Sequence, residues 1–342
     1  MKKIILSSVL LSVLIFTSCK TTTELEKSYP APSSSIDAVE FNEVWGYVMN
    51  KREKDYTPEL PVTDIGYFIS AVNTFSELDQ VPTKGKFFSN TSARVHLVTS
   101  CDSKAQTHLL LSPEYSLRDK IIDQLIAATE TYDGLQIDWE LVPADDAEYF
   151  AQFLKILKSK LNGKMLSVAV PARIKTLEKD AYNYETISSI ADRIIVMAYD
   201  QHWSTSKPGT IAGTDWCEKI ADYALTKIEP DKLVMGMSFY GRAWRDDTEG
   251  GKAYIYSSTE KLIKEHKVKK IVRDEYLTPS FTFTKKLTIT TWYDDAASLK
   301  LRTEMYRNKG IKNLSFWRIG QEDKNYWQYL KVDKNKQSLQ LN

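Results

Sequence analysis

Residues 131–140, Thr-Tyr-Asp-Gly-Leu-Gln-Ile-Asp-Trp-Glu, place two carboxylates two positions apart in an otherwise apolar run. Because side chains alternate across an extended strand, Gln136, Asp138 and Glu140 would share one face, while the apolar residues between them share the other. An Asp-Gly turn signal precedes the apolar part of the run, and Pro143 follows the run closely. This arrangement is typical of a short, buried parallel strand with polar groups along one wall.

Two carboxylates on one buried strand indicate acid–base chemistry. Neighbouring carboxylates are costly to bury unless they share a proton or hydrogen bonds. Such a pair is usually kept where one acid must hold its proton while the other stays charged, as in cleavage of a glycosidic bond. The alternative for an isolated Asp-x-Glu is a surface strand with a solvated polar face, and the wholly apolar opposite face argues against it.

The composition favours a neutral ligand. The 342 residues carry a formal net charge of +1 with acids and bases interspersed, so no basic patch indicates a nucleic-acid partner. Eight Trp and nineteen Tyr supply flat side chains that stack on sugar rings, although most are expected in the core. Four scattered His and the absence of a Cys-x-x-Cys pair leave no metal-ligand spacing, so we predict no metal, no cofactor and a monomer. The spacing of Cys101 and Cys217 does not determine whether they pair.

The first residues have the layout of a secretory signal. Two lysines precede an apolar run at residues 4–16, which is too short to span a bilayer comfortably. The following Thr-Ser-Cys19 is similar to the cleavage box of bacterial lipoproteins, in which the cysteine is lipidated. We expect a signal peptide at 1–18 and a lipid-anchored linker at 19–38, on a periplasmic or cell-surface protein that contacts the membrane through this anchor only. Plain removal of the signal peptide is the alternative.

Strand-like runs alternate with helical patterns along most of the chain. Apolar stripes predict one helix at residues 117–128, capped by Ser116, and another at 150–161, ending at Asn162-Gly163. Eight strand-like runs lie at residues 44–49, 65–71, 94–99, 134–140, 165–171, 194–199, 233–239 and 314–317. Alternation of strands and helices implies a parallel sheet, and eight repeats suggest closure into a barrel.

The predicted fold is therefore of the α/β class, a TIM (β/α)8 barrel over residues 39–330 with a tail at 331–342. Residues 245–290 break the alternation and are predicted to form a small α+β insertion between the seventh strand and its helix. The expected elements of this insertion are a helix at 259–266 and strands at 280–283 and 287–291.

In such a barrel, the position of a residue along its strand becomes informative, because active sites lie at the carboxyl ends of the strands. Glu140 ends the predicted fourth strand, Tyr199 and Asp200 end the sixth, Tyr240 follows the seventh, and Trp317 closes the eighth. Each residue alone has a structural explanation, as a strand anchor, a helix cap or a core side chain. Their convergence on one mouth of the barrel predicts a functional site.

Several segments resemble glycoside hydrolase family 18, the chitinases and their relatives. Residues 133–140 look like the family signature Asp-x-x-Asp-x-Asp-x-Glu. Residues 197–200 (Met-Ala-Tyr-Asp), 236–242 (Gly-Met-Ser-Phe-Tyr-Gly-Arg) and 314–317 (Leu-Ser-Phe-Trp) are similar to the motifs of the sixth, seventh and eighth strands. Residues 291–295 resemble the segment that re-enters the barrel after the family's insertion. The resemblance spans about residues 44 to 329, and it is poor at the first and third strands.

The resemblance implies a substrate-assisted, retaining hydrolysis. Glu140 would be the general acid that protonates the departing glycosidic oxygen, and the substrate's own 2-acetamido carbonyl would attack the anomeric carbon. Asp138 would orient the acetamide N–H and stabilise the oxazolinium, and Tyr199 would donate a hydrogen bond to the acetamide carbonyl. The resemblance also implies contacts to the sugar from Asp200 beside the acetamide, Trp317 as the floor, and Met197, Tyr240 and Arg242 around them. Gln136 is likewise expected to bind substrate.

Gln136 departs from the family signature, which has an aspartate at this position. A glutamine can hydrogen-bond to Asp138 but cannot ionise, so we expect Asp138 to stay charged, to face Glu140 and to alter the pH profile. An amide at this position, together with His202 after Asp200, is also similar to the branch of the family that acts on bacterial peptidoglycan.

Several functions remain open on the sequence. The leading one is cleavage of β-1,4 bonds after N-acetylglucosamine in chitin or its oligosaccharides, with peptidoglycan N-acetylglucosaminidase and N-glycan chitobiose-core endoglycosidase as enzymatic alternatives. The alternative of another class is a chitinase-like lectin that binds glycans without cutting them. Such members of the family typically lack the acid, whereas Glu140 is present.

Overall fold

The structure is a computed structural model that describes residues 37–79 and 81–333. The predicted signal peptide, Cys19 and almost all of the predicted linker lie outside the described residues. So does most of the predicted tail.

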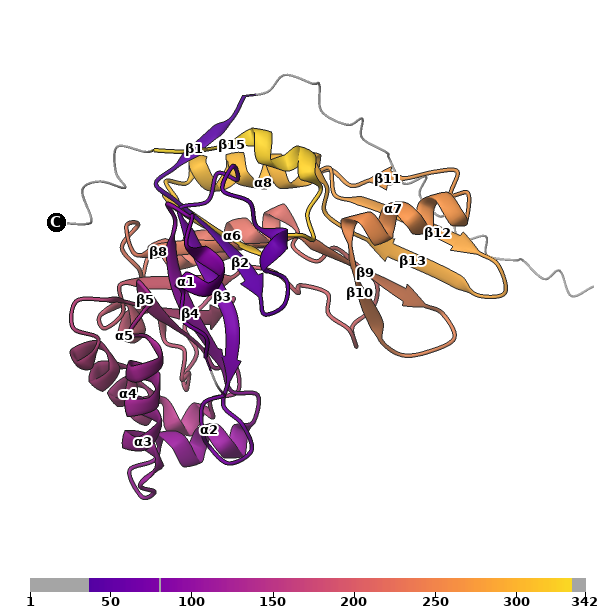
Figure 1. Cartoon of the computed structure of the whole chain (residues 1–342). Coiled ribbons are helices and arrows are strands. Elements are labelled where there is room, and N and C mark those ends of the chain that lie inside the picture. Colours follow the sequence, from indigo (N-terminus) through magenta and orange to yellow (C-terminus); the bar gives the residue numbers. More distant parts are fainter. Residues whose placement is uncertain (1–36, 80, 334–342) are drawn as a thin grey trace, which may run out of the picture.

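Eight parallel strands close into a barrel (Figure 1), which confirms the predicted TIM (β/α)8 fold. In spatial order the strands are β14 (Asn313–Trp317), β2 (Glu43–Met49), β3 (Asp64–Ala71), β4 (Arg94–Ser100), β5 (Gly134–Asp138), β6 (Met165–Pro171), β7 (Arg193–Met197) and β8 (Leu233–Ser238). Strands β5 and β7 each end two residues earlier than predicted. Glu140 and Tyr199 therefore lie beyond the strand ends, in the loops that follow.

The barrel strands are buried on both faces, which is why their sequences are nearly continuous apolar runs. In β6, all residues from Leu166 to Val170 are buried, and in β7 the same holds from Arg193 to Val196. Helices cover the outside of the barrel and bury the other side of these strands.

The described helices are α1 (Gly85–Phe88), α2 (Lys104–Leu111), α3 (Leu117–Ala128), α4 (Ala147–Lys160), α5 (Tyr184–Ser188), α6 (Thr214–Leu225), α7 (Tyr256–Glu265) and α8 (Ala296–Asn308), with short 3-10 turns at Glu53–Asp55, Ala144–Asp146 and Lys324–Tyr329. The two predicted helices correspond to α3 and α4. Ser116 precedes α3 as expected, but its side chain makes no capping hydrogen bond, contrary to the prediction. Beyond α4 the chain reverses through Asn162 and Gly163, at φ 49° and 86°, where glycine is favoured.

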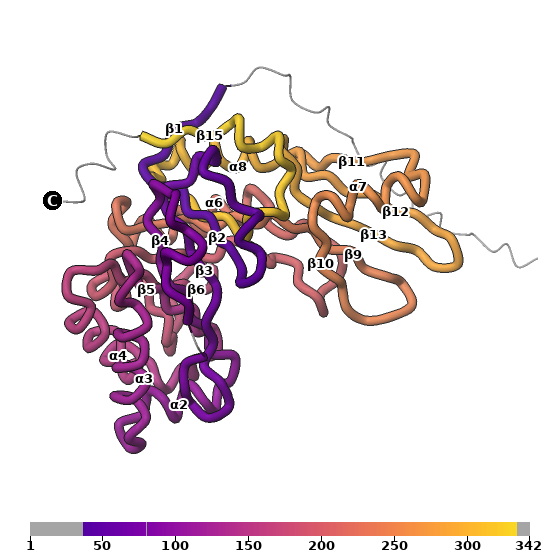
Figure 2. Tube along the Cα trace, in the orientation of Figure 1, coloured from indigo at the N-terminus to yellow at the C-terminus, as the bar shows by residue number. Residues whose placement is uncertain are grey.

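The insertion forms a second, antiparallel sheet that projects to one side of the barrel (Figures 1 and 2). Its strands, in spatial order, are β10 (Gly251–Ile255), β9 (Tyr240–Arg245), β13 (Thr288–Trp292), β12 (Pro279–Thr284) and β11 (Val272–Arg273). The sheet begins at Tyr240, earlier than the predicted boundary at 245. Only Phe239 separates β8 from β9, so no turn residue marks the passage from barrel to sheet.

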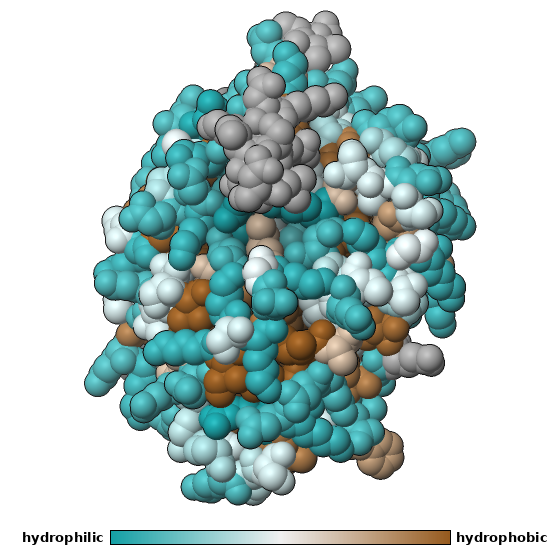
Figure 3. Space-filling model, turned by 60° about the vertical axis from the view of Figure 1, so that its left-hand side comes forward, coloured by the Kyte–Doolittle hydropathy of each residue, from teal (hydrophilic) through white to brown (hydrophobic). Residues whose placement is uncertain are grey.

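Two short strands join the described ends of the chain. Strand β1 (Val39–Phe41) pairs in parallel with β15 (Leu330–Val332), so the start of the predicted tail belongs to a strand. Among the described residues, none of the helices has the length and apolar character needed to cross a bilayer. The face shown in Figure 3 is mostly hydrophilic, with apolar side chains in scattered patches, the largest of them across the lower middle of the view.

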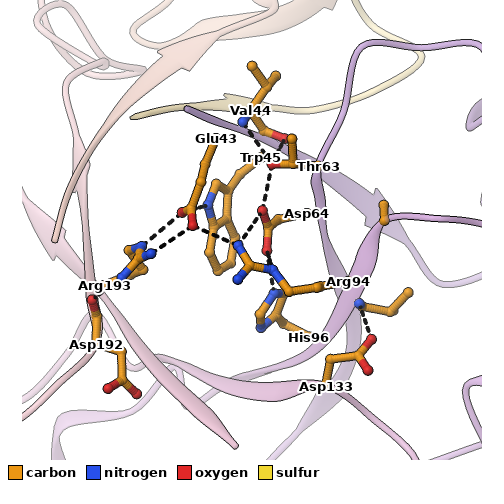
Figure 4. A network of polar contacts seen from close by, with 12 residues as sticks. Glu43, Val44, Trp45, Thr63, Asp64, Arg94, His96, Asp133, Asp192 and Arg193 are labelled. Carbon is orange, nitrogen blue, oxygen red and sulfur yellow. Dashed lines mark hydrogen bonds and ion pairs between the residues drawn. The ribbon is translucent and has the colours of Figure 1, made fainter. Parts of the chain in front are cut away.

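Inside the barrel, at the amino ends of its strands, lies a buried network of charged side chains (Figure 4). Arg193 donates to both carboxylate oxygens of Glu43, at 2.8 and 2.7 Å. Arg94 bridges Glu43, at 2.7 Å, to Asp64, at 2.7 and 2.9 Å. His96 Nε2 lies 2.8 Å from Asp64 Oδ1. Burial opposes ionisation of Asp64, but the hydrogen bond to His96 and the charge of Arg94 outweigh it and lower its pKa to about 2.

Candidate active site

The carboxyl end of the barrel opens into a cavity of about 470 Å³. Seven predicted site residues line it, namely Asp138, Glu140, Met197, Tyr199, Asp200, Tyr240 and Trp317. These residues come from β5, β7 and β14, from the loops that directly follow β5 and β7, and from the first position of β9. The structure thus brings together residues that are far apart in the sequence, as convergence at the barrel mouth predicted.

Asp138 is the last residue of β5 and is only 7% exposed. Its Oδ1 atom is buried and has no hydrogen-bond partner among the described residues. Burial, followed by the charges of Glu140 and Asp102, raises the pKa of Asp138 to about 8. The expectation that Asp138 stays charged is therefore wrong, because the barrel gives it neither a cation nor a hydrogen-bond donor.

Glu140 occupies a different environment. It lies in a turn two residues beyond β5, and its side chain reaches solvent at the mouth of the cavity. Partial loss of solvation, together with the charges of Asp102 and Asp200, raises the pKa of Glu140 above the usual value. Both carboxyls therefore bind protons more readily than an isolated acid, and the more accessible of the two is Glu140.

Gln136 points into the barrel interior but does not bond to Asp138. Its amide pairs with the hydroxyl of Tyr47 on β2, which lies 3.0 Å from Oε1 and 2.7 Å from Nε2. The hydrogen bond that Gln136 could make to Asp138 is not formed, and Gln136, which was expected to bind substrate, does not line the cavity. Gly66 makes room for Tyr47, because a Cβ at position 66 would lie 2.5 Å from the tyrosine ring.

Tyr199 packs behind the carboxylates. Its ring meets that of Tyr240 edge-on at 6.3 Å. Burial, together with the neighbouring Tyr47 hydroxyl, raises the pKa of Tyr199 well above the usual value, so its hydroxyl is a hydrogen-bond donor at every working pH. Gly236 is required at this point, since a Cβ would lie 2.8 Å from the carbonyl oxygen of Val196 and 3.1 Å from the Tyr199 ring.

Asp200 and Arg242 form an ion pair beside the cavity. Arg242 Nη2 lies 3.0 Å from Asp200 Oδ1. Asp200 adopts a left-handed backbone conformation at φ 59°, which aspartate tolerates better than most residues. Arg242 does not line the main cavity; it lines an adjoining one of about 290 Å³, which reaches the insertion and shares Asp200, Tyr240 and Trp317.

The indole of Trp317 forms one wall of the cavity. It packs against the ring of Tyr47 at 5.4 Å and against that of Phe68 at 5.1 Å, edge to face. The peptide bond after Trp317 is cis. Trp317 thus lines the cavity as predicted, and rings from β2 and β3 pack against it.

Four residues of functional interest escaped the sequence interpretation, namely Tyr47, Phe68, Ser100 and Asp102. They lie on or just after the first three barrel strands, two of which match the family poorly. For Asp102 a signal existed, because it follows the carboxyl end of a barrel strand. Strands β4 and β5 pair with Ser100 opposite Asp138, so two residues farther along Asp102 and Glu140 stand on neighbouring strand ends and line the same cavity.

Cys101 and Cys217 are both buried and free, so they do not pair. Burial raises the pKa of each thiol to about 11, which disfavours the reactive thiolate. Within residues 37–79 and 81–333, no group of three or more His, Cys, Asp and Glu side chains could hold a metal ion.

A barrel with two carboxyls and an indole around one cavity at its carboxyl end has the architecture of a glycoside hydrolase. The sequence model described as "Glycosyl hydrolases family 18" matches residues 85–322, more than half of the chain. The chain belongs to glycoside hydrolase family 18.

Three similar proteins illustrate the relationship. The "Uncharacterized glycosylase YvbX" of Bacillus subtilis is 27% identical over 226 residues, which cover 63% of this chain and 65% of YvbX. The "Cortical fragment-lytic enzyme" of Bacillus anthracis is 24% identical over 228 residues, covering 63% of this chain and 53% of that enzyme. The crystal structure of the Bacillus cereus spore cortex-lytic enzyme SleL superposes with a TM-score of 0.77 at 21% identity, covering 89% of this chain and 77% of SleL. The chain thus spans between half and two thirds of the length of these two curated relatives, and the likeness to SleL shows a shared fold.

Proposed function

We propose that this protein is a retaining, substrate-assisted hydrolase that cleaves β-1,4 bonds after N-acetylglucosamine, with Glu140 as its general acid. The observation that carries the proposal is the contrast between the two carboxyls. Asp138 is buried with an unpartnered Oδ1 atom, while Glu140 reaches the open cavity with its pKa raised. A general acid needs access to the leaving group and a proton to give at working pH.

The chemistry assigned to each residue follows from its surroundings. Glu140 protonates the glycosidic oxygen while the acetamido oxygen of the substrate attacks the anomeric carbon, and Glu140 then takes a proton from the water that opens the oxazolinium. Two inversions at one carbon give net retention. Asp138 Oδ1 is an acceptor without a partner, suited to the acetamide N–H, and positive charge on the oxazolinium favours ionisation of this acid.

The aromatic residues hold the sugar in position. Tyr199 keeps its proton and can donate it in a hydrogen bond to the acetamide carbonyl. The face of Trp317 lies against the cavity and provides an apolar floor for the sugar ring. No nucleophilic side chain is needed, because the acetamido group already belongs to the substrate.

Three polymers that contain N-acetylglucosamine are candidate substrates. Relatives named as cortical fragment-lytic enzymes, and the likeness to the spore cortex-lytic enzyme SleL, support bacterial peptidoglycan as the substrate. Chitin and its oligosaccharides are the second candidate, supported by an N-acetyl-recognising geometry that fits either polymer. The chitobiose core of N-glycans would use the same residues.

The test compares the wild type with Glu140→Gln on three substrates, namely chitin oligomers, peptidoglycan sacculi and a high-mannose glycopeptide. New reducing ends are identified by mass spectrometry. We expect product from at least one polymer, and a loss of about 10²-fold or more in Glu140→Gln, the usual contribution of a general acid. Glu148→Gln, which removes an exposed carboxylate from the first turn of α4, serves as the matched control and should leave activity unchanged.

The outcomes separate the alternatives. Product from none of the three substrates, with binding retained, would favour the glycan-binding lectin. Full activity in Glu140→Gln would refute the assignment of the acid.

A further inference from the structure

Glu140 is not held in place by the barrel's strand ladder. Strand β5 ends at Asp138, and Glu140 and Leu141 form a turn that reaches solvent, with Leu141 37% exposed. A general acid must nevertheless keep its carboxyl within hydrogen-bond reach of one oxygen of the substrate. Some other contact must therefore fix the backbone of this turn.

The hydroxyl of Tyr182 supplies that contact from the neighbouring loop between β6 and α5. It donates a hydrogen bond to the carbonyl oxygen of Trp139, at 2.6 Å, and accepts one from the backbone N–H of Val142, at 2.9 Å. One oxygen atom thus joins the residue before Glu140 to a residue just after it. A third bond, from Thr107 Oγ1 to the carbonyl of Leu141 at 2.8 Å, fixes the turn from α2.

Tyr182 is itself immobilised. Its side chain is buried, and its ring meets that of Phe150 edge-on at 5.9 Å. Its backbone N–H donates to Asp180 Oδ1 at 3.0 Å, and Asp180 is paired with Arg173 at 2.9 and 3.0 Å. The contact on the turn is therefore anchored at both ends, in the core and in an ion pair of its own loop.

We propose that Tyr182 is a positioning residue for Glu140, whose hydroxyl fixes the turn that carries the general acid. The inference rests on the proposed function and adds a residue that does not line the cavity. Burial, with the charges of Glu140 and Asp138 acting in the same direction, raises the pKa of the Tyr182 hydroxyl above the usual value. The hydroxyl therefore donates throughout the pH range in which Glu140 changes its protonation.

The test replaces only the hydroxyl, in Tyr182→Phe. The matched control is Tyr132→Phe, because Tyr132 is also buried and its hydroxyl donates to a backbone carbonyl, that of Pro82 at 2.7 Å. Both variants lose one buried hydroxyl, but only one of them loses bonds beside Glu140. A merely structural role predicts the same behaviour for both.

Kinetics are measured on 4-methylumbelliferyl and 2,4-dinitrophenyl chitobiosides. Methylumbelliferone needs more assistance from an acid than dinitrophenolate, which departs readily as the anion. In Tyr182→Phe we expect kcat/KM, which reports the steps up to departure of the leaving group, to fall about 10- to 100-fold on the first substrate and less than about threefold on the second, with KM on the first changed by less than about threefold. Tyr132→Phe should change none of these. A parallel fall on both substrates, or no fall beyond that of Tyr132→Phe, would overturn the proposal.

Amide hydrogen exchange gives a second readout that needs no substrate. Val142 loses its acceptor in Tyr182→Phe, so exchange over residues 139–142 should accelerate about tenfold or more, and Tyr132→Phe should leave it unchanged. Unchanged exchange in Tyr182→Phe would refute the positioning role. Because this measurement does not depend on turnover, a wild type inactive on both glycosides would count against the proposed function while exchange still decides the role of Tyr182.

Discussion

Buried carboxylates at the two ends of the barrel have opposite electrostatic surroundings. At the amino end, Glu43 and Asp64 share Arg94 and Arg193, so each negative charge has a cation within 3 Å. At the carboxyl end, none of the residues that line the main cavity carries a positive charge, and Asp138 has an oxygen without a partner. Burial alone therefore does not distinguish a reactive carboxyl from a structural one in this molecule. The presence or absence of a neutralising partner does.

The pKa values express this difference. Asp64 has a pKa of about 2 because its hydrogen bond to His96 and the charge of Arg94 outweigh burial. Asp138 has a pKa of about 8 because burial and two negative neighbours act in the same direction. The first group is fixed as an anion, and the second can hold or release a proton near neutral pH.

The largest effect is expected from breaking the amino-end network. Arg193→Met removes the cation that pairs with both oxygens of Glu43 and leaves a buried charge with one partner fewer. The free energy of unfolding should fall by about 3 to 5 kcal/mol, measured by urea titration.

The control for this prediction is Arg245→Met, which breaks the exposed pair with Asp247 and should leave the free energy of unfolding nearly unchanged. Equal losses in the two variants would mean that the buried network is no more important than a surface pair.

The second prediction concerns Asp138 at the carboxyl end of the barrel, where ionisation of the carboxyl lowers the stability of the fold. Asp138 has a higher pKa folded than unfolded, so its stabilising effect is present below the unfolded value and is lost as pH rises through about 8. Asp138→Asn cannot ionise and escapes this loss. The stability advantage of the variant, measured from urea midpoints, should therefore grow between pH 5 and pH 9 by an amount on the order of a few kcal/mol.

Asp64 provides the contrast, because its lowered pKa means that stability is present above about pH 4 and is lost as pH falls toward about 2. If the stability difference between wild type and Asp138→Asn were the same at pH 5 and pH 9, the raised pKa of Asp138 would be refuted.

The smallest effect concerns Asp102, whose charge lies beside Glu140 at the mouth of the cavity. Asp102→Asn removes a negative neighbour, which lowers the pKa of Glu140, so the acid loses its proton at lower pH. The basic limb of the profile of kcat/KM should move down by roughly half to one pH unit.

High salt should shrink the shift, because the charges near the mouth are exposed to solvent. Asp119→Asn, in the exposed first turn of α3, is the control and should leave the profile in place. A basic limb that stays put, or moves up, in Asp102→Asn would exclude Asp102 from the electrostatics of the acid.

The sequence was sufficient for the features that depend on periodicity and order. Apolar runs of strand length located all eight barrel strands, and the rule that sites lie at carboxyl ends brought Asp138, Glu140, Tyr199 and Trp317 to one cavity. The sequence was not sufficient for features that depend on contacts between strands distant in the sequence. The partner of Gln136 is Tyr47, 89 residues away, and a pattern of alternation cannot identify it.

The failures at element boundaries have a similar cause. The end of β5 at Asp138 and the start of β9 at Tyr240 follow from pairing with neighbouring strands, whereas the local sequence continues smoothly through both. The raised pKa of Asp138 does not follow from the local sequence, because burial and the charges of Glu140 and Asp102 outweigh the absence of a charge at Gln136.

The pairing of β1 with β15 determines on which side of the barrel the described chain begins. Strand β1 ends at Phe41, immediately before β2 begins at the amino end of the barrel, so the described chain starts on the side opposite the cavity. If the chain were attached to a surface through the segment before Asp37, as the expected lipidation of Cys19 would do, the catalytic mouth would face outward. An enzyme oriented in this way would approach polymers beyond the surface that carries it, rather than those lying against it.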